Sequence, residues 1–299
     1  MLDTAYVITG PTSGIGHATA LDLAAYGTVV LVGRNSGKLD DVRAAIGRKG
    51  GRAVSIVCDM ADLASVRRAA EQILALPYTV AGVLNNAGVM RPQTTKSIDG
   101  FDMTFATNYL GPFALTDALT PHLPDGANLV YISSAIEDPD RRPAQVMGMR
   151  GGQFISVGAS AEGQWRAGGS KMPGIDAYAT SKQCILAAAM GFARENPRLR
   201  FNTVEPGITP GTGLGGVNNP LLVFLFSQVI TRLPPFSRYR STPKRSARTI
   251  TQVLTDSSDK TGVYFDEKGK PMHGSALAHD PSFQHRLLAE TREFLASRS

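Results

Sequence analysis

The sequence predicts an α/β fold in a single domain, with a doubly wound parallel β-sheet between two helical layers in the order αβα. Short runs rich in β-branched residues alternate along the chain with longer stretches of helical period. These runs are continuously apolar, as strands are in a sheet that is covered on both faces. The length of 299 residues and the hydrophobic content of 42% suit one large domain with an ordinary core.

The same pattern places each element in order. The expected strands are Ala5–Thr9, Thr28–Val32, Ala53–Val57, Val80–Asn85, Asn128–Ser133 and Phe201–Val204. The expected helices between them are Gly16–Ala25, Lys38–Arg48, Leu63–Leu74, Phe101–Leu119 and Ala177–Arg194. After the sixth strand we expect a helix over Pro243–Leu254, a short strand in the run GVYF and a last helix near Ser282–Ala296. Ligands of such sheets bind at the carboxyl ends of the strands.

Composition excludes several classes of protein. The two cysteines, Cys58 and Cys184, cannot form a disulfide framework, which fits a reducing, cytoplasmic compartment. The N-terminus lacks the pattern of a signal peptide, and the longest uninterrupted apolar run, Leu221–Phe226, is far shorter than the ~20 residues of a membrane helix. The net charge of +6 is scattered, and the histidines show no metal-ligand spacing. We therefore expect no integral membrane segment, no nucleic-acid partner and no metal.

A glycine-rich turn follows the first strand and opens a helix. Glycines let the backbone approach a pyrophosphate, and the first turn of a helix offers free N–H groups to phosphates. The spacing G-x-x-x-G-x-G differs from the G-x-G-x-x-G fingerprint, so a plain turn is the alternative. The candidate cofactor contacts in this turn are Gly10, Thr12, Ser13, Gly14, Ile15 and Gly16.

The second strand runs into Arg34 and Asn35. An acidic residue at this place would bind the 2′-hydroxyl of NAD, whereas an arginine can hold the 2′-phosphate of NADP. The sequence therefore favours NADP(H) as cofactor, with an arginine simply on the surface as the alternative.

Four motifs together resemble the short-chain dehydrogenase/reductase family. They are the TGxxxGIG turn, Asp59 after the third strand, the run Asn85–Gly88 after the fourth, and Tyr178-Ala-Thr-Ser-Lys182. They cover roughly residues 5–212, and the layout is most similar to carbonyl reductases, retinol dehydrogenases and protochlorophyllide reductases. The resemblance implies a Rossmann-type fold. It also implies that further cofactor contacts come from Asp59, Met60, Asn86, Ala87 and Gly88.

Tyr178 and Lys182 are four residues apart and so share one helix face. A tyrosine pKa of ~10 is too high for efficient proton transfer near neutrality, and a nearby ammonium lowers it. We expect Tyr178 as the acid/base, with Lys182 lowering its pKa and binding the nicotinamide ribose. The resemblance implies that Ser134 orients the substrate carbonyl, with Ser133 as rival because a one-residue slip exchanges them. It also implies a proton relay through Asn108.

The sixth strand runs into Pro206, Gly207 and Thr209. The resemblance implies that this turn lies beside the nicotinamide amide, and that Thr212 is a further contact. The family's usual threonine position holds Gly211 here, and Thr212 follows it directly.

Two irregular stretches, 135–176 and 207–240, interrupt the alternation of strands and helices. The first separates Ser134 from Tyr178 by 44 residues, and we expect it to wall the substrate pocket. The second contains the apolar run Leu221–Leu233, which fits a substrate lid, a membrane-touching surface or a dimer face.

These observations predict an enzyme that reduces the carbonyl group of a bulky, hydrophobic small molecule with NADPH, or catalyses the reverse oxidation. An NADP(H)-binding sensor or scaffold without turnover is the alternative from another class. Reduction of a double bond in a tetrapyrrole-like substrate is a further enzymatic alternative. The resemblance is compatible with a homo-oligomer, and the substrate itself cannot be read from the sequence.

Overall fold

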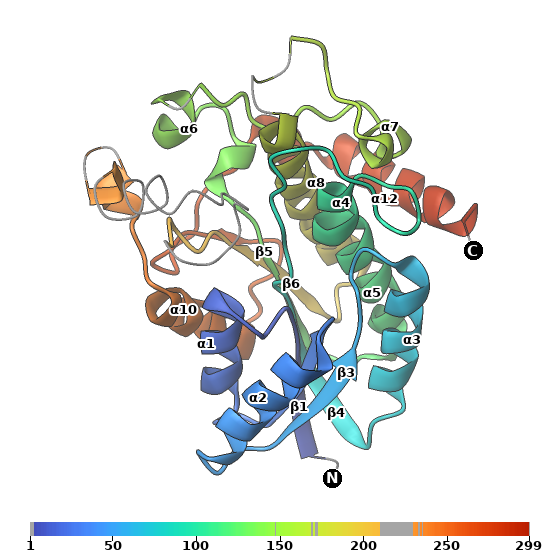
Figure 1. Ribbon diagram of the computed structural model, residues 1–299, viewed down its shortest axis with the longest axis vertical. Coiled ribbons are helices and arrows are strands. Elements are labelled where there is room, and N and C mark those ends of the chain that lie inside the picture. The colour runs from blue at the N-terminus through green and yellow to red at the C-terminus, as the bar shows by residue number, and fades with distance from the viewer. Residues whose placement is uncertain are drawn as a thin grey trace.

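A computed structural model describes residues 3–146, 148–168, 170, 173–209, 230–232, 234 and 236–298 (Figure 1). Its centre is a seven-stranded, wholly parallel sheet in the order β3-β2-β1-β4-β5-β6-β7. The strands are β1 Asp3–Thr9, β2 Thr28–Gly33, β3 Ala53–Val57, β4 Tyr78–Asn85, β5 Asn128–Ile132, β6 Arg200–Val204 and β7 Tyr264–Phe265. The strand order reverses between β1 and β4, so the crevice for a ligand opens there. The predicted fold class is confirmed.

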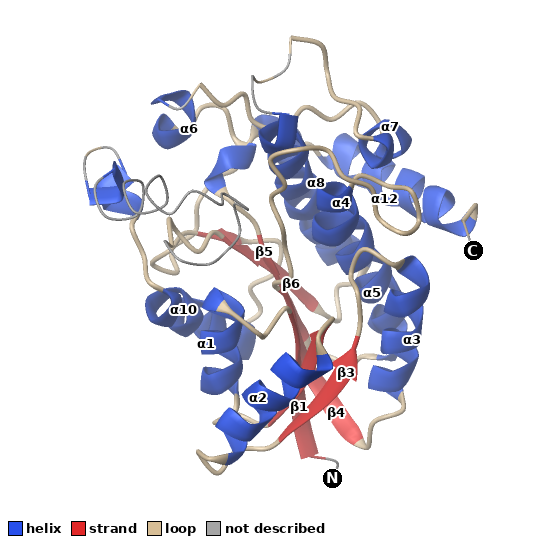
Figure 2. Cartoon of the chain, in the orientation of Figure 1, coloured by secondary structure: helices blue, strands red, loops and turns tan. Residues whose placement is uncertain are grey.

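Helices cover both faces of the sheet (Figure 2). On one face α1 Gly14–Leu23, α2 Ser36–Gly47 and α10 Pro243–Thr255 enclose an apolar core. On the other, α3 Leu63–Leu74, α5 Gly111–Leu119 and α8 Pro173–Glu195 enclose a larger one, with α12 Pro281–Ala296 outside α8. Two apolar faces per strand explain the continuous apolar runs in the sequence.

The edge strand β3 departs from the expectation of full burial, since Val57 is 56% exposed. Strand order decides which strand lies at an edge, and the local sequence of β3 does not reveal that order.

The helix expected over Phe101–Leu119 contains a π-helical segment. It consists of α4 Met103–Phe105, η1 Ala106–Leu110 and α5. Pro112 has no N–H to donate to the carbonyl of Asn108, and the N–H of Gly111 donates five residues back, to Ala106. The wide turn that results carries Asn108, and such π segments frequently occur at functional sites.

The stretch 135–176 is more regular than expected. It contains η3 Ala135–Glu137, α6 Arg142–Val146, α7 Val157–Glu162 and the first turn of α8, which begins at Pro173. Figure 1 shows α6 and α7 beyond the carboxyl ends of the strands. These helices are too short for their period to be recognised in the sequence.

The remaining helical segments are short or lie near the C-terminus. They are η2 Thr120–His122, η4 Ile230–Arg232, η5 Phe236–Tyr239 and α11 Ala276–His279. Within the residues that the model describes, no helix combines the length and apolar character needed to cross a membrane.

A buried carboxyl group fixes the start of the 135–176 stretch to the C-terminal part of the chain. Glu137 is fully buried and accepts hydrogen bonds from the backbone N (2.9 Å) and Oγ (2.6 Å) of Ser275. Burial raises the pKa of Glu137 to about 7, although both hydrogen bonds oppose the shift. The ionised carboxylate is therefore a cost to the folded state.

This cost predicts a pH-dependent stability. Between about pH 4.5 and 7 the folded protein holds a proton on Glu137 that the unfolded chain has released, so this group makes stability fall as pH rises. Glu137→Gln removes the dependence, and the variant should gain stability relative to the wild type by up to about 3 kcal/mol between pH 5 and 8. Urea unfolding at pH 5 and at pH 8 measures the free energy of unfolding of the variant and of the wild type. Glu71→Gln, at an exposed position of α3, is the control. An equal gain in stability in both variants would show that the pH dependence does not come from the buried Glu137.

Candidate active site

The glycine-rich turn between β1 and α1 lies against the segment that follows β4. Asn86 Nδ2 donates to the carbonyls of Thr9 (2.9 Å) and Gly10 (3.0 Å), and Thr9 Oγ1 accepts from the backbone of Asn86 and Ala87. Gly10 has a φ of +67°, in the left-handed region that favours glycine. A Cβ atom on Gly16 would lie 2.2 Å from the Gly10 carbonyl oxygen. The two loops at the strand-order reversal are thus in contact without room for larger side chains.

The first turn of α1 is open to a ligand. Ser13, the N-cap residue, makes no side-chain capping hydrogen bond in the described structure. Gly14 and Ile15 are half-buried and Ser13 is exposed, so the first N–H groups of this ten-residue helix face an accessible surface. Free N–H groups and the positive helix end suit a phosphate at this position. The half-buried Thr12 lies in the same turn.

Arg34 and Asp59 lie side by side at the carboxyl ends of β2 and β3. Arg34 Nη1 is 3.9 Å from Asp59 Oδ2, and both side chains are exposed enough for the pair to open at little cost. Asn35 caps α2 by accepting from the Lys38 N–H (2.9 Å). The Met60 side chain is buried in the core, which leaves its backbone as the part that could contact a cofactor.

The predicted catalytic residues converge at the carboxyl ends of β4 and β5. The Ser134 hydroxyl lies close enough to the Tyr178 hydroxyl to influence its pKa. Lys182 Nζ lies 5.5 Å from the centre of the Tyr178 ring and donates to the carbonyl of Ile132 (2.7 Å). Ser133 instead donates to the Lys182 carbonyl (3.0 Å) and is buried, whereas Ser134 is half-exposed. The geometry therefore favours Ser134 over Ser133 as the serine that faces a substrate.

The expected lowering of the Tyr178 pKa by Lys182 is not found. Burial raises the pKa of Tyr178, and the neighbouring Ser134 hydroxyl only partly opposes the shift. Burial also lowers the pKa of Lys182 to about 8. Attraction between an ammonium and a phenolate would favour both charged forms, whereas the enclosed site disfavours both.

Asn108 joins the loop after β4 to α8. Its Oδ1 accepts from the Val89 N–H (2.8 Å), and its Nδ2 donates to the Val89 carbonyl (2.9 Å) and to Ser181 Oγ (3.1 Å). A Cβ atom on Gly88 would lie 3.4 Å from Asn108 Oδ1 and 3.7 Å from Lys182 Nζ. The structure thus brings Asn108, Gly88 and Lys182 together. Ser181, which sequence reasoning did not single out, links Asn108 to the Tyr178 carbonyl (2.7 Å).

The turn after β6 borders the same site. Gly207 has a φ of +76°, and the carbonyl of Pro206 accepts from Ser246 Oγ (2.7 Å). Thr209 Oγ1 lies 3.3 Å from Ser246 Oγ, so it faces α10. Thr212 and residues 221–229 and 233 of the apolar run lie outside the described residues. Glu205, directly before this turn, is a buried acidic residue that the sequence analysis did not single out.

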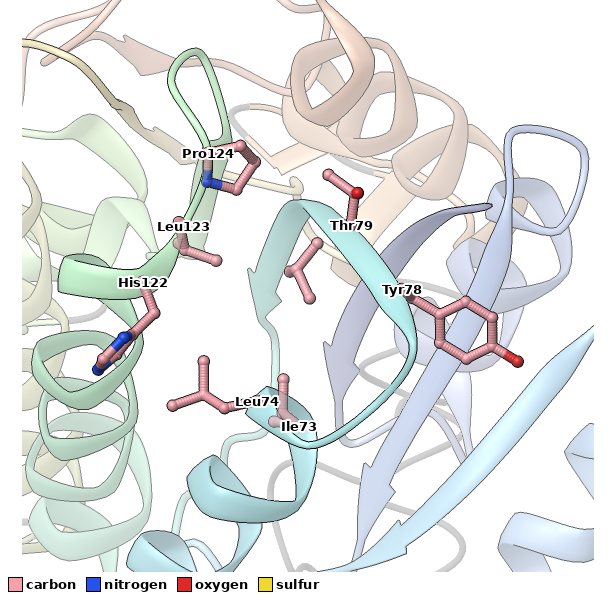
Figure 3. Close-up of a pocket in the computed structure, with 8 residues that line it drawn as sticks. Ile73, Leu74, Tyr78, Thr79, His122, Leu123 and Pro124 are labelled. Atoms are coloured by element: carbon pink, nitrogen blue, oxygen red, sulfur yellow. The ribbon is translucent and has the colours of Figure 1, made fainter. Parts of the chain in front are cut away.

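A separate hollow of about 370 Å³ lies at the opposite end of the sheet (Figure 3). It is lined by Ile73, Leu74, Tyr78, Thr79, Val80, His122, Leu123 and Pro124. Tyr78 is the first residue of β4, and the catalytic candidates lie beyond the other ends of the strands. This hollow is therefore no part of the candidate active site. The described residues also contain no cluster of three or more potential metal-ligating side chains.

A parallel sheet with an open helix end at its reversal point is typical of dinucleotide-binding folds, and here serine, tyrosine and lysine side chains lie beside that point. Residues 4–142 match the family model described as short chain dehydrogenase. Protochlorophyllide reductase B of Oryza sativa subsp. japonica is 30% identical over 285 residues, which cover 87% of this chain and 68% of that protein. The chain belongs to the short-chain dehydrogenase/reductase family.

One further sequence relative and two solved structures are also similar to this chain. Dehydrogenase/reductase SDR family member 12 of Bos taurus is 30% identical over 216 residues, 70% of this chain and 62% of that protein. A protein from Mycobacterium paratuberculosis has a solved structure with a TM-score of 0.71 at 24% identity, covering 98% of this chain and 93% of that one. A short chain dehydrogenase from Burkholderia cenocepacia, solved in complex with NADP, has a TM-score of 0.65 at 23% identity, with 88% and 96% covered. These structures share the fold.

Proposed function

We propose that the protein is an NADP(H)-dependent oxidoreductase that reduces the carbonyl group of a bulky, hydrophobic small molecule to an alcohol, or catalyses the reverse reaction. The observation that carries the proposal is the convergence of Ser134, Tyr178 and Lys182 at the end of the sheet where α1 opens. The relative from Burkholderia cenocepacia, which was solved with NADP, supports the cofactor.

The residues present fit such a cofactor. Gly10 and Gly16 pack so closely against each other and against Asn86 that a Cβ atom on either would clash. The tight turn that results would let a pyrophosphate approach the backbone, with the N–H groups of α1 directed at it. Arg34 would hold the 2′-phosphate, and Lys182 the nicotinamide ribose. Asn86, Ala87, Gly88, Pro206 and Gly207 are half-buried around the same crevice and would line the remainder. When bound, NADPH supplies the hydride.

The side chains supply the proton. Ser134 would hydrogen-bond the substrate carbonyl oxygen and hold it beside Tyr178, and the Tyr178 hydroxyl would donate its proton to that oxygen. Since burial raises the pKa of Tyr178, the phenol keeps its proton near neutral pH, in the form that can donate. Asn108, in contact with the Gly88–Lys182 region, is the residue through which a proton would be relayed.

The substrate pocket would be formed by the two irregular stretches. Both ends of residues 135–176 adjoin catalytic candidates, and α6 and α7 lie beyond the strand ends. Residues 207–240 would contribute the lid from their apolar run. Apolar walls of this kind suit a large hydrophobic carbonyl compound.

The proposal is tested by mixing the protein with NADPH and a panel of aliphatic, aromatic and polycyclic carbonyl compounds in the dark, and following the nicotinamide absorbance. Turnover of at least one bulky carbonyl is expected. Tight NADPH binding without turnover of any would indicate the sensor alternative. Because relatives include protochlorophyllide reductases, a tetrapyrrole with a reducible double bond is assayed in darkness and in light. Turnover of that compound alone would replace carbonyl reduction by double-bond reduction.

Cofactor preference provides a sharper test. Arg34→Asp places a like charge beside the 2′-phosphate, so kcat/KM with NADPH should fall about 10- to 100-fold while NADH becomes the better cofactor. Initial rates with both cofactors measure the ratio. The control is Arg43→Asp, which makes the same charge change on the exposed side of α2. An unchanged preference in Arg34→Asp would assign discrimination to another residue.

A further inference from the structure

A buried hydrogen-bond network holds the turn that begins with Ser134. The Ser134 carbonyl accepts from the Glu137 N–H (3.1 Å), which closes the η3 turn. The Glu137 side chain is fully buried, and its two carboxyl oxygens accept from Ser275, one from the backbone N–H (2.9 Å) and the other from the hydroxyl (2.6 Å). This pair of hydrogen bonds, the Glu137–Ser275 clamp, fixes the direction of the carboxyl group as well as its distance, as two-pronged contacts to a carboxylate do.

The clamp is joined to the helix that carries the acid/base candidates. The Ser275 hydroxyl accepts from Gln183 Nε2 (3.0 Å), and Gln183 directly follows Lys182 on α8. Because this hydroxyl donates to Glu137 and accepts from Gln183, its orientation is set from both sides. The turn of Ser134 is therefore linked to α8 through Ser275.

The segment that carries Ser275 is fastened to the edge of the sheet. The Met272 N–H donates to the carbonyl of Tyr264 in β7 (2.7 Å). A Cβ atom on Gly274 would lie 2.5 Å from Glu137 Oε1, so the backbone of this segment lies directly against the carboxyl group. Ser275 is thus placed by the sheet, and the clamp transmits that placement to Glu137.

We propose that Glu137 and Ser275 are positioning residues for Ser134, and that their clamp holds the Ser134 hydroxyl where it can bind the substrate carbonyl beside Tyr178. Ser134 follows the end of β5 and is half-exposed, so packing alone gives its side chain little support. Burying a carboxylate is costly, and a neutral side chain of the same size would fill the place of Glu137 without that cost. The carboxylate therefore indicates a role beyond packing. The inference rests on the proposed function, since it concerns the serine that would bind the carbonyl.

The test is a double-mutant cycle on kcat for carbonyl reduction, in which Ser134→Ala, Ser275→Ala and the double variant are compared with the wild type. Ser275→Ala keeps the N–H bond to Glu137 but loses the hydroxyl. Its kcat should fall about tenfold with the Kd for NADPH unchanged, because a small misplacement of a catalytic group is costly. In the Ser134→Ala background the clamp has no hydroxyl left to position, so adding Ser275→Ala should change kcat by less than about twofold. Single turnovers with excess enzyme keep the slow variants measurable.

Two results of the cycle would overturn the proposal. Losses that multiply in the double variant would show that Ser275 acts on the fold or on Tyr178 independently of Ser134. An unchanged kcat in Ser275→Ala would show that the clamp does not position Ser134 at all.

Thr120→Val is the matched control for the loss of a buried hydroxyl. Thr120 is buried, and its hydroxyl donates to the Thr116 carbonyl (2.7 Å). It lies two residues before His122, which lines the hollow at the opposite end of the sheet. The kcat of Thr120→Val should equal that of the wild type. A loss equal to that of Ser275→Ala would assign the effect to lowered stability and contradict the proposal.

Glu137→Gln separates positioning from stability. An amide offers one acceptor oxygen where the carboxylate offers two, so one of the two bonds from Ser275 is lost at similar volume. Because this variant is expected to be more stable than the wild type, a role in folding alone predicts no loss of activity. The clamp instead predicts a kcat lowered about three- to tenfold.

All rates are compared at pH 8, where Glu137 is ionised in the wild type. Lys182, whose pKa is lowered to about 8, is present in every variant, so its titration is common to all of them. If Ser275→Ala does not fold, Glu137→Gln takes its place in the cycle with Ser134→Ala; if neither folds, the clamp is structural and the proposal fails. Wild-type kcat in Glu137→Gln would also overturn it. Absence of wild-type turnover refutes the proposed function, whereas turnover with multiplied losses refutes this inference alone.

Discussion

Replacing Tyr178 by phenylalanine is expected to lower kcat for carbonyl reduction about 1,000-fold or more, with the Kd for NADPH nearly unchanged. The substitution removes only the hydroxyl that would donate the proton, and the buried ring keeps its place against Lys182. Ser134 loses a neighbouring hydroxyl but is half-exposed, where water can take its place. Loss of turnover with unchanged NADPH binding would therefore show that the variant lacks the proton donor and is still folded. Steady-state rates and a fluorescence titration of NADPH measure the two quantities.

Tyr131→Phe is the matched control for this experiment. Tyr131 is likewise a fully buried tyrosine whose pKa is raised by burial, and its hydroxyl is hydrogen-bonded to Thr116 Oγ1 (2.8 Å). Its replacement should cost about 1 kcal/mol of stability and leave kcat near the wild-type value. Retention of activity in Tyr178→Phe would remove Tyr178 from the mechanism. Equal losses in both variants would indicate a disturbed fold instead of a lost proton donor.

How much of this site the sequence could predict depends on the type of information required. Spacing along one helix was enough to associate Tyr178 with Lys182, because four residues complete about one turn. The end of β5 was harder, because a one-residue slip of register sends Ser133 or Ser134 to the opposite face. Only the pairing with β6 and the packing on α8 separate the two serines.

Electrostatic properties of the site could be predicted least. Residue types indicated an ammonium beside a phenol, but burial decides both pKa values, and burial is a property of the assembled domain. The same is true of Glu205, whose position directly after β6 is visible in the sequence while its burial is not. The fold could be predicted more fully, because strands covered on both faces are continuously apolar in the sequence. The edge strand β3 does not follow this rule, since Val57 is exposed.

Gly16→Ala is expected to destabilise the domain by about 3 kcal/mol or more and to weaken NADPH binding at least about tenfold. The added Cβ atom would lie 2.2 Å from the Gly10 carbonyl oxygen and 2.4 Å from Asn86 Nδ2. The first of these atoms is backbone and the second is fixed by two hydrogen bonds, so neither can retreat without opening the contact between the loops after β1 and β4. Both loops line the proposed cofactor crevice, and stability and binding should therefore fall together.

Gly47→Ala isolates this effect from the ordinary consequences of replacing glycine. Gly47 is the last residue of α2, and a Cβ atom there would meet nothing within 4 Å. Alanine is the better helix former, so this variant should be stabilised by up to about 1 kcal/mol and should bind NADPH as the wild type does. Thermal unfolding should show a Tm lowered by roughly 5 °C or more in Gly16→Ala, with none of that loss in Gly47→Ala. Should Gly16→Ala keep the wild-type Tm but lose NADPH affinity, the glycine would be needed for the ligand's approach and not for the contact between the loops. Should it keep both, the close packing of this turn would be wrong, and the cofactor crevice would have to be placed elsewhere.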